Sequence, residues 1–234
     1  MKITMIGHST LLIEANGKRL LTDPFWNAWG NPAFKRLGSP AISREEAARV
    51  DAVLLSHGHW DHTDARYFKM LGQIPVYAPA PASLLVKLMG ARNVHTVRVG
   101  QYFNVGDVKI TVVPAVHVTI TVGFIIEGEG KTVYFAADTF RAPFMRGLGD
   151  QYKLDAALMP VTTYRLPMTM GEKSALKAVR DLKPAVVVPI HLGIEPRSPL
   201  LRTGQTPQHF AQLLKEEGID TQVRLLSEGE SLSL

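Results

Sequence analysis

Short apolar runs separated by turn residues fill the N-terminal part of the chain. The runs cover residues 3–6, 11–13 and 20–21. Asn16-Gly17 lies between the second and third runs, and this dipeptide is typical of the turn in a two-residue β-hairpin. The pattern therefore predicts three strands, the last two of which form a hairpin.

Further strand-like runs continue to the end of the chain. A group of β-rich segments covers residues 94–136, with turns at Gly106-Asp107 and near Gly130. Short apolar runs of a length that suits strands occupy residues 52–55, 75–78, 156–159 and 185–188, and residues 222–226 are expected to form a closing strand.

Helices are expected between these strands. Residues 64–71 and 81–90 indicate two of them, whereas the stretch 24–40, rich in proline, glycine and aromatic residues, predicts a loop. Patterns typical of a helix start occur at Ser43 with Glu46, at Thr169 with Glu172, and at Thr206 followed by Pro207. A β-rich block followed by helices occurs once in each half. We therefore expect an α/β fold of two packed sheets with outer helices, in one domain over residues 1–234.

Composition and charge narrow the function classes. Apolar residues make up 46% of the 234 positions and charged residues 20%, which suits a globular protein with a sizeable core. The net charge of +5 carries no long basic run, so it permits an anionic substrate and does not favour nucleic acid. We expect no membrane span and no signal peptide, and therefore a cytoplasmic location. The absence of cysteine excludes disulfides, cysteine metal sites and a cysteine nucleophile.

A dense group of side chains that can bind metal follows the predicted strand 52–55. Within six positions stand His57, His59, Asp61 and His62. Neutral imidazole is the commonest protein ligand of transition metals, and carboxylate is its usual companion. His57 and His59 can point the same way in extended backbone, while Asp61 and His62 lie further on and can face a second metal. The alternative, a polar loop that is merely rich in histidine, is disfavoured by this density.

Three more candidate ligands each follow an apolar, strand-like run. They are His117, Asp138 and His191. Singly, a polar residue at a strand end usually has a structural explanation. Together with the group at residues 57–62, they predict the remaining ligands of a metal site.

This order of residues resembles the metallo-β-lactamase superfamily. The match begins at Asp23, includes the motif at residues 57–62, and continues through His117, Asp138 and His191. Finer detail is similar to the branch of ascorbate-6-phosphate lactonase and the N-acylphosphatidylethanolamine phospholipase D-like hydrolases, as seen in Gly7-His8-Ser9, Thr22-Asp23-Pro24-Phe25 and Val188-Pro189-Ile190-His191. The resemblance implies a four-layer αβ/βα sandwich, with two mixed β-sheets and helices on the outer faces.

The resemblance also implies a dinuclear metal site. One ion would be held by His57, His59 and His117. The second would be held by Asp61, His62 and His191, with Asp138 bridging the two ions. Zinc is the expected metal, and Mn²⁺ or Fe²⁺ would suit the same nitrogen and oxygen ligands.

The expected activity is hydrolysis of an ester, lactone or phosphodiester in a small, anionic substrate, by a hydroxide that bridges the metals. Asp61 is a candidate catalytic residue that accepts a proton from the nucleophile. His8 is a second candidate, which contacts either the substrate or the side chains that bind the metals. A strand-end histidine with a backbone hydrogen bond is the alternative for His8. The alternatives for the whole protein are a non-hydrolytic metal-binding or redox member of the fold, and an RNA-processing nuclease. The sequence leaves open whether the chain forms a homo-oligomer.

Other residues are candidates for supporting roles. Asp23 is expected to orient the metal-binding loops by hydrogen bonding. His95 and His209 are expected at the surface. Candidates for lining the pocket or for contacting an anion are the aromatic residues Phe25, Trp26, Trp29 and Phe34, and, from the segments 139–149 and 161–170, Arg141, Phe144, Met145, Arg146, Tyr164, Arg165, Met168 and Met170. The alternative for the aromatic residues is a separate hydrophobic cluster under the loop, and for most of the arginines a solvated surface position.

Overall fold

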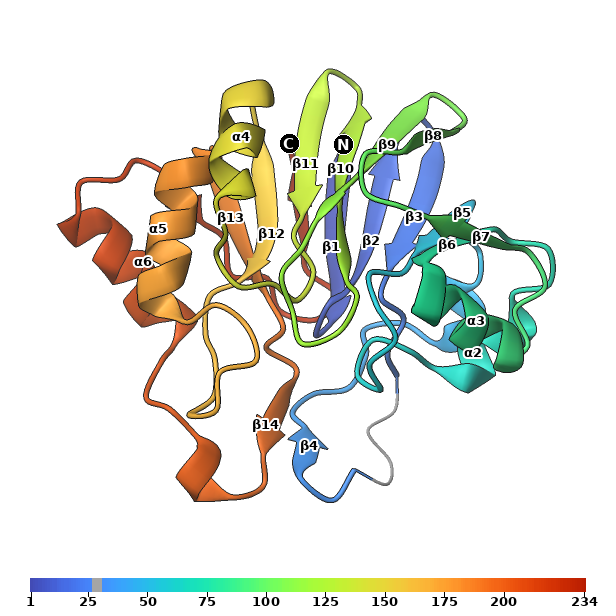
Figure 1. Cartoon of the computed structure of the whole chain (residues 1–234), viewed down its shortest axis with the longest axis horizontal. Coiled ribbons are helices and arrows are strands. Elements are labelled where there is room, and N and C mark those ends of the chain that lie inside the picture. The colour runs from blue at the N-terminus through green and yellow to red at the C-terminus, as the bar shows by residue number, and fades with distance from the viewer. Residues whose placement is uncertain (27–30) are drawn as a thin grey trace.

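Two mixed β-sheets lie face to face, and helices cover both outer surfaces (Figure 1). The computed structural model describes residues 1–26 and 31–234. The four layers confirm the αβ/βα sandwich that the resemblance implied.

The first sheet consists of strands from the N-terminal half, with the C-terminal strand at one edge. Its strand order is β16-β1-β2-β3-β5-β6-β7. The strands are β1 (Lys2–Gly7), β2 (Thr10–Ala15), β3 (Lys18–Thr22), β5 (Ala52–Leu54), β6 (Val76–Pro79), β7 (Val94–Val97) and β16 (Ser231–Ser233). Its outer face is covered by α1 (Arg44–Ala47), α2 (Ala65–Met70) and α3 (Ala80–Leu88).

The second sheet has the order β15-β13-β12-β11-β10-β9-β8. The strands are β8 (Tyr102–Val105), β9 (Val108–Pro114), β10 (Val122–Gly128), β11 (Lys131–Phe135), β12 (Ala156–Pro160), β13 (Val186–Ile190) and β15 (Gln222–Val223). Its outer helices are α4 (Phe144–Gln151), α5 (Glu172–Leu182) and α6 (Pro207–Glu216). A short antiparallel pair, β4 (Phe34–Arg36) with β14 (Ile194–Pro196), and the 3-10 helix η1 (Pro199–Leu201) lie beyond one end of the sheets.

Alternation along the strands sorts side chains between the layers. On β10, Phe124 and Ile126 face the other sheet, whereas Ile125 packs on the opposite side with Met145 of α4 and Leu176 of α5. This is the two-residue period of a strand that is buried on both faces. The rigid double layer fixes where each strand ends, and the candidate ligands follow those ends.

Most predicted elements are present. Asn16-Gly17 forms the turn of the β2–β3 hairpin, with Ala15 opposite Lys18. Ser43 caps α1 by accepting a hydrogen bond from the backbone N–H of Glu46, as its spacing predicted.

One predicted cap is wrong. Helix α5 begins at Glu172, but its N-cap is Gly171 and no Thr169 cap forms. The Glu172 carboxylate instead accepts from the backbone N–H of Thr206, at 2.7 Å, and lies 2.9 Å from His209 Nδ1. The Glu172 carboxylate therefore joins α5 to α6 and is not available for the predicted capping box.

Candidate metal centre

The candidate ligands gather at the end of the two sheets next to β4 and β14 (Figure 1). Each follows a strand that ends there. His8 follows β1, residues 57–62 follow β5, His117 follows β9, Asp138 follows β11 and His191 follows β13. Convergence of strand ends thus brings together side chains that lie far apart in the sequence.

A first group contains His57, His59 and His117. One ring nitrogen of each lies within 4.8 Å of the others. His117 Nε2 and His59 Nδ1 are 3.2 Å apart, and two nitrogen ligands of one tetrahedral zinc ion lie roughly 3.3 Å apart. Burial lowers the pKa of His57 well below its ordinary value and that of His117 to about 4. Both rings are therefore neutral near pH 7, the form that binds metal.

A second group contains Asp61, His62 and His191, joined by His8. Asp61 Oδ2 is 3.5 Å from His191 Nε2 and 3.9 Å from His62 Nε2. Burial lowers the pKa of both imidazoles, but the Asp138 carboxylate outweighs it. The pKa of His62 is raised well above its ordinary value, and that of His191 to about 9.

Asp138 lies between the two groups. Its Oδ1 is 3.4 Å from His62 Nε2, and its Oδ2 is 3.1 Å from His191 Nε2 and 3.8 Å from His117 Nε2. Burial raises the pKa of this carboxyl, yet the His191 and His62 imidazoles outweigh burial and hold it well below its usual range. An ionised carboxylate that reaches both groups can bridge two cations.

Unpaired buried atoms test whether these residues fit metal ions. Within residues 1–26 and 31–234, several buried atoms have no hydrogen-bond partner: the Nε2 atoms of His57 and His62, and Asp138 Oδ1. A buried polar atom without a partner costs free energy, so such atoms call for an explanation. They point into the two groups, and cations there would satisfy them. The residues therefore fit a metal centre.

Asp23 orients rings of both groups. Its Oδ2 lies 2.7 Å from His62 Nδ1 and accepts a hydrogen bond from Ser56 Oγ at 2.6 Å. Ser56 Oγ in turn lies 2.8 Å from His57 Nδ1. Because each Nδ1–H is used in this way, each Nε2 is directed into the cluster. This is the hydrogen-bonding role expected for Asp23.

His8 differs from the other histidines at the centre. Its Nδ1 accepts a hydrogen bond from the backbone N–H of Gly193, at 3.1 Å. Burial lowers the pKa of His8 to about 3, so the ring is neutral and its proton is on Nε2. That Nε2 lies 3.4 Å from Asp61 Oδ2. No hydrogen bond forms between these two atoms. With its proton on Nε2 and its Nδ1 accepting from Gly193, the His8 ring offers no free lone pair to a metal.

Left-handed backbone is concentrated at the centre. Non-glycine residues with positive φ include His8 (61°), Asp23 (35°), Ala137 (56°) and His191 (64°). Such conformations cost of order 1–3 kcal/mol each and persist where the surroundings enforce them. The fold thus holds three of these polar side chains, and the residue before Asp138, in strained positions.

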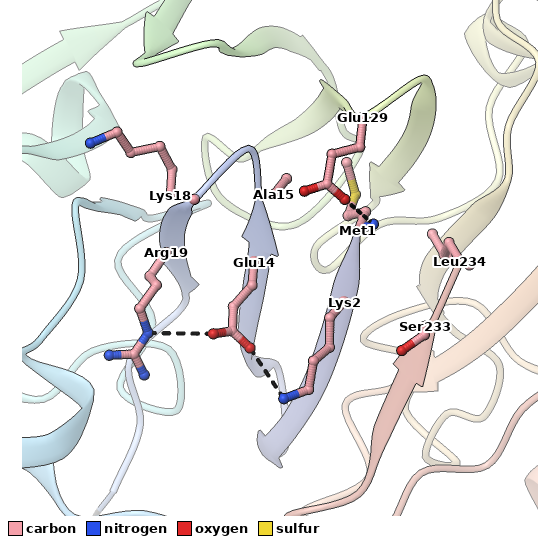
Figure 2. Close-up of a pocket in the computed structure, with 10 residues that line it drawn as sticks. Met1, Lys2, Glu14, Ala15, Lys18, Arg19, Glu129, Ser233 and Leu234 are labelled. Carbon is pink, nitrogen blue, oxygen red and sulfur yellow. Dashed lines mark hydrogen bonds and ion pairs between the residues drawn. The ribbon is translucent and has the colours of Figure 1, made fainter.

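A cavity of about 170 Å³ opens onto the two groups. Its lining residues are Phe34, His59, Trp60, Asp61, His117, Asp138, Tyr164, Met168, His191 and Ile194. A larger surface hollow lies at the opposite end of β1 (Figure 2). Figure 2 shows Glu14 of this hollow paired with Lys2, at 3.3 Å, and with Arg19, at 3.7 Å, and the N-terminal amine of Met1 paired with Glu129. Lys18 pairs with Asp51 outside the hollow. The cavity at the histidines is therefore the candidate substrate site.

Several predicted pocket residues lie elsewhere. Arg141 and Arg146 pair with Asp181 on α5, at 2.6 and 3.4 Å, and neither lines the cavity. Trp26 stacks on Tyr67 in the core, with ring centroids 5.0 Å apart. Met145 and Met170 are buried in the core beside the second sheet, Phe144 packs against the same cluster, and the fully buried Phe25 does not line the cavity. Trp29 lies outside the described residues, and Arg165 is exposed away from the lining.

Phe34, Tyr164 and Met168 do line the cavity, as proposed from the sequence. Trp60 and Ile194 were missed. Trp60 sits inside the histidine motif without a role of its own, and Ile194 reaches the cavity only through its pairing with β4. His95 and His209 are exposed, as expected.

Comparisons with known proteins identify the family and the fold. A family model described as a Beta-lactamase superfamily domain matches residues 18–192. A UPF0173 metal-dependent hydrolase from Methanopyrus kandleri is 34% identical over 252 residues, covering 99% of each chain. A solved metallo hydrolase from Ignicoccus hospitalis is 27% identical with a TM-score of 0.78, covering 99% of this chain and 97% of that one. A metallo-β-lactamase fold protein from Bacillus subtilis superposes with a TM-score of 0.73 at 17% identity, covering 99% and 98%.

Fold, centre and relatives define a metal-dependent hydrolase of the metallo-β-lactamase superfamily. Within that class, the chain belongs to the UPF0173 metal-dependent hydrolase family. No helix in the described part of the chain is both long and apolar enough to cross a membrane.

Proposed function

We propose that the chain is a dinuclear hydrolase that cleaves an ester, lactone or phosphodiester with water as the nucleophile. The observation that carries this proposal is the Asp138 carboxylate, whose oxygens lie within 3.8 Å of imidazole nitrogens in both groups. A single-ion site would need only one of those groups. Two groups around one carboxylate favour two ions about 3.5–4 Å apart.

The ligand assignment follows from the two groups. One ion is assigned to His57, His59 and His117, and the second to Asp61, His62 and His191, with Asp138 shared. Zinc is the proposed metal, because a nitrogen-rich set at this spacing suits tetrahedral zinc. Mn²⁺ and Fe²⁺ are the alternatives that metal analysis of protein purified without chelators will separate.

Two ions bound here would supply an acidified water and a Lewis acid for the substrate oxygen. Among the protein's own groups, Asp61 lines the cavity, and its low pKa leaves it ionised and able to accept a proton from the attacking water. His8 Nε2, which carries the proton of the ring, lies 3.4 Å from Asp61 Oδ2 and positions that carboxylate by electrostatic attraction. No arginine or lysine among the described residues lines the cavity. Stabilisation of the anion that forms at the scissile centre is therefore left to the two ions that the assigned ligands would hold.

A single-turnover reaction in ¹⁸O-labelled water tests the nucleophile. Direct attack by water predicts label at the carbonyl or phosphoryl atom of the product in the first turnover. Label that enters only in a second turnover would reveal a nucleophile of the protein and overturn the mechanism. Metal analysis of the same sample, with two ions expected per chain, tests the centre separately.

A further inference from the structure

Three aromatic side chains form one wall of the cavity. They are Phe34, Trp60 and Tyr164. The ring centroid of Phe34 lies 6.0 Å from that of Trp60 and 5.4 Å from that of Tyr164. Met168 and Ile194 add apolar surface to the same lining. The wall is therefore continuous and apolar, and it stands beside the residues assigned to the ions.

The fold fixes these rings in place. Phe34 is on β4, which pairs with β14 so that Phe34 lies opposite Pro196. The Tyr164 hydroxyl donates to the backbone carbonyl of Ile194, at 3.1 Å, so it is already used. Trp60 packs edge-on against the buried Phe25, with 5.7 Å between ring centroids. What the wall offers a ligand is ring surface rather than hydrogen-bond donors.

No lysine or arginine among the described residues lines the cavity. Two cations lie close by. Lys35 pairs with Glu195 across the β4–β14 pair, at 2.7 Å. The Arg36 guanidinium donates to the backbone carbonyls of Gly38 and Phe25, while its buried Nη2 has no hydrogen-bond partner in the described part of the chain. An anionic substituent that faced the rings, on the side away from the assigned metal ligands, would therefore be desolvated without a cation in the lining, which is costly.

The volume limits what the wall can hold. The cavity measures about 170 Å³, and an engineered apolar cavity of about 150 Å³ in another protein holds one benzene molecule. The assigned metal ligands line part of the same space, so the part beside the rings holds no more than a single ring or a short branched alkyl group.

We propose that the cavity binds the non-reacting part of the substrate as one uncharged apolar group of about the size of an aromatic ring. The enzyme then prefers neutral aryl or short alkyl esters and lactones. This inference rests on the proposed hydrolytic function and replaces the expectation of a substrate that carries its own anionic group. In the reaction, the oxygen of water bonds to the acyl carbon, the bond from that carbon to the leaving oxygen breaks, and the leaving oxygen takes a proton from the water.

A matched pair of esters tests the preference. The metal-loaded enzyme is assayed on phenyl acetate and on 4-acetoxybenzoate, which differ by a carboxylate opposite the ester. We expect kcat/KM to be about tenfold higher for phenyl acetate. The carboxylate of 4-acetoxybenzoate would lie against the aromatic wall without a cationic partner in the lining. Equal values, or a preference for the charged ester, would overturn the inference while leaving hydrolysis itself supported.

Variants of the wall locate the binding. Trp60→Ala should raise KM for phenyl acetate roughly tenfold with a smaller effect on kcat, because it removes apolar contact area and no proposed ligand. Tyr164→Phe keeps the ring and should stay within about twofold of the parent. Tyr102→Ala is the remote control, since Tyr102 is a 70% exposed aromatic residue outside the cavity.

A binding measurement decides the inference even if no ester is hydrolysed. Benzyl alcohol is titrated into metal-free protein while the indole N–H signals of tryptophan are followed by NMR. We expect a saturable shift of the Trp60 signal, weakened in Phe34→Ala and retained in Tyr102→Ala. Absence of binding to the parent protein, or binding that Phe34→Ala leaves unchanged, refutes the aromatic subsite. Failure of hydrolysis with intact binding would refute only the proposed function.

Discussion

The Asp23 carboxylate lies 2.7 Å from Nδ1 of His62 and, through Ser56, also reaches Nδ1 of His57. We assign these two imidazoles to different ions, although one ligand atom from each of Asp23, His57 and His62 also lies within 4.8 Å of the others. One fully buried carboxylate, which itself binds no ion in our assignment, therefore sets the ring orientation on both sides of the centre. Orientation of this kind raises metal affinity by directing the metal-binding nitrogen toward the ion's position.

Replacing this carboxylate should weaken both ions together. For Asp23→Asn we expect metal affinity to fall about 10- to 100-fold, because the neutral amide no longer fixes the His62 and Ser56 protons. Competition with a chromophoric chelator measures the affinity. Asp64→Asn is the matched control: Asp64 is buried and pairs with Arg44, so its loss should lower stability and leave metal affinity near the parent value. An Asp23→Asn protein that binds two ions as tightly as the parent would contradict this role.

Two histidines each contact a carboxylate, but only one of their alanine variants should lose metal. His191→Ala removes a proposed ligand and should lose the second ion and nearly all activity. His209→Ala breaks a half-exposed contact with Glu172 and should retain both ions, at a stability cost of at most about 1 kcal/mol. Metal content and thermal unfolding of the purified variants give the comparison. Equal loss of metal from both variants would show that the ligand assignment is wrong.

The sequence is informative where the signal is local. The ligand motif at residues 57–62 is contiguous, and His117, Asp138 and His191 each follow an apolar run that ends as a strand. Because buried strands of one sandwich end at common edges, strand-end residues converge even when the topology is unknown. Local turn chemistry likewise predicted the Asn16-Gly17 hairpin.

The cavity wall could not be predicted in the same way. Its geometry depends on β4, which lies in a stretch predicted to be a loop, and on the pairing of β4 with β14. Three-residue strands carry too little periodicity to be recognised, and their partner lies far along the chain. The expected arginine contacts failed for a related reason, because Asp181 on a distant helix captures Arg141 and Arg146. Tertiary pairing, rather than local pattern, decides the substrate side of this centre.

The close approach of Gly193 to His8 makes a further prediction. A Cβ atom added at Gly193 would lie 2.8 Å from His8 Cβ and 3.0 Å from its backbone nitrogen. Gly193→Ala should therefore push His8 away, break the bond to its Nδ1, and cost about 1–3 kcal/mol of stability. Gly147→Ala is the control, since no described atom lies within 4 Å of the new methyl group and alanine favours the helix there.

The readout for Gly193→Ala combines thermal unfolding with the nitrogen chemical shifts of His8. In the parent, the shifts should report a neutral ring protonated at Nε2. In the variant, that tautomer should no longer dominate, and kcat should fall. A Gly193→Ala protein with parent stability and an unchanged His8 tautomer would show that the close packing does not hold the ring.

The metal-free protein should lose stability as the pH rises above neutrality. Burial lowers the pKa of His191, but the Asp138 and Asp61 carboxylates outweigh burial and raise it to about 9; the pKa of His62 is raised in the same direction. An unfolded histidine titrates near 6.5. The folded state therefore binds more protons than the unfolded state between these values, and the stabilisation is complete below about pH 6.5 and lost as the pH rises through about 9.

Unfolding of chelator-treated protein between pH 7 and 9.5 tests this titration. In a domain of this size, 1 kcal/mol shifts Tm by about 2–4 °C, so the fall in Tm should be measurable. The metal-loaded protein should show a smaller fall, because His62 and His191 bind metal without the extra proton. His191→Ala in the metal-free form should flatten the profile, since the titrating ring is absent. A level Tm across this range in the metal-free parent would mean that these imidazoles are neutral beside ionised carboxylates, and that the charge pairing described at the centre does not occur.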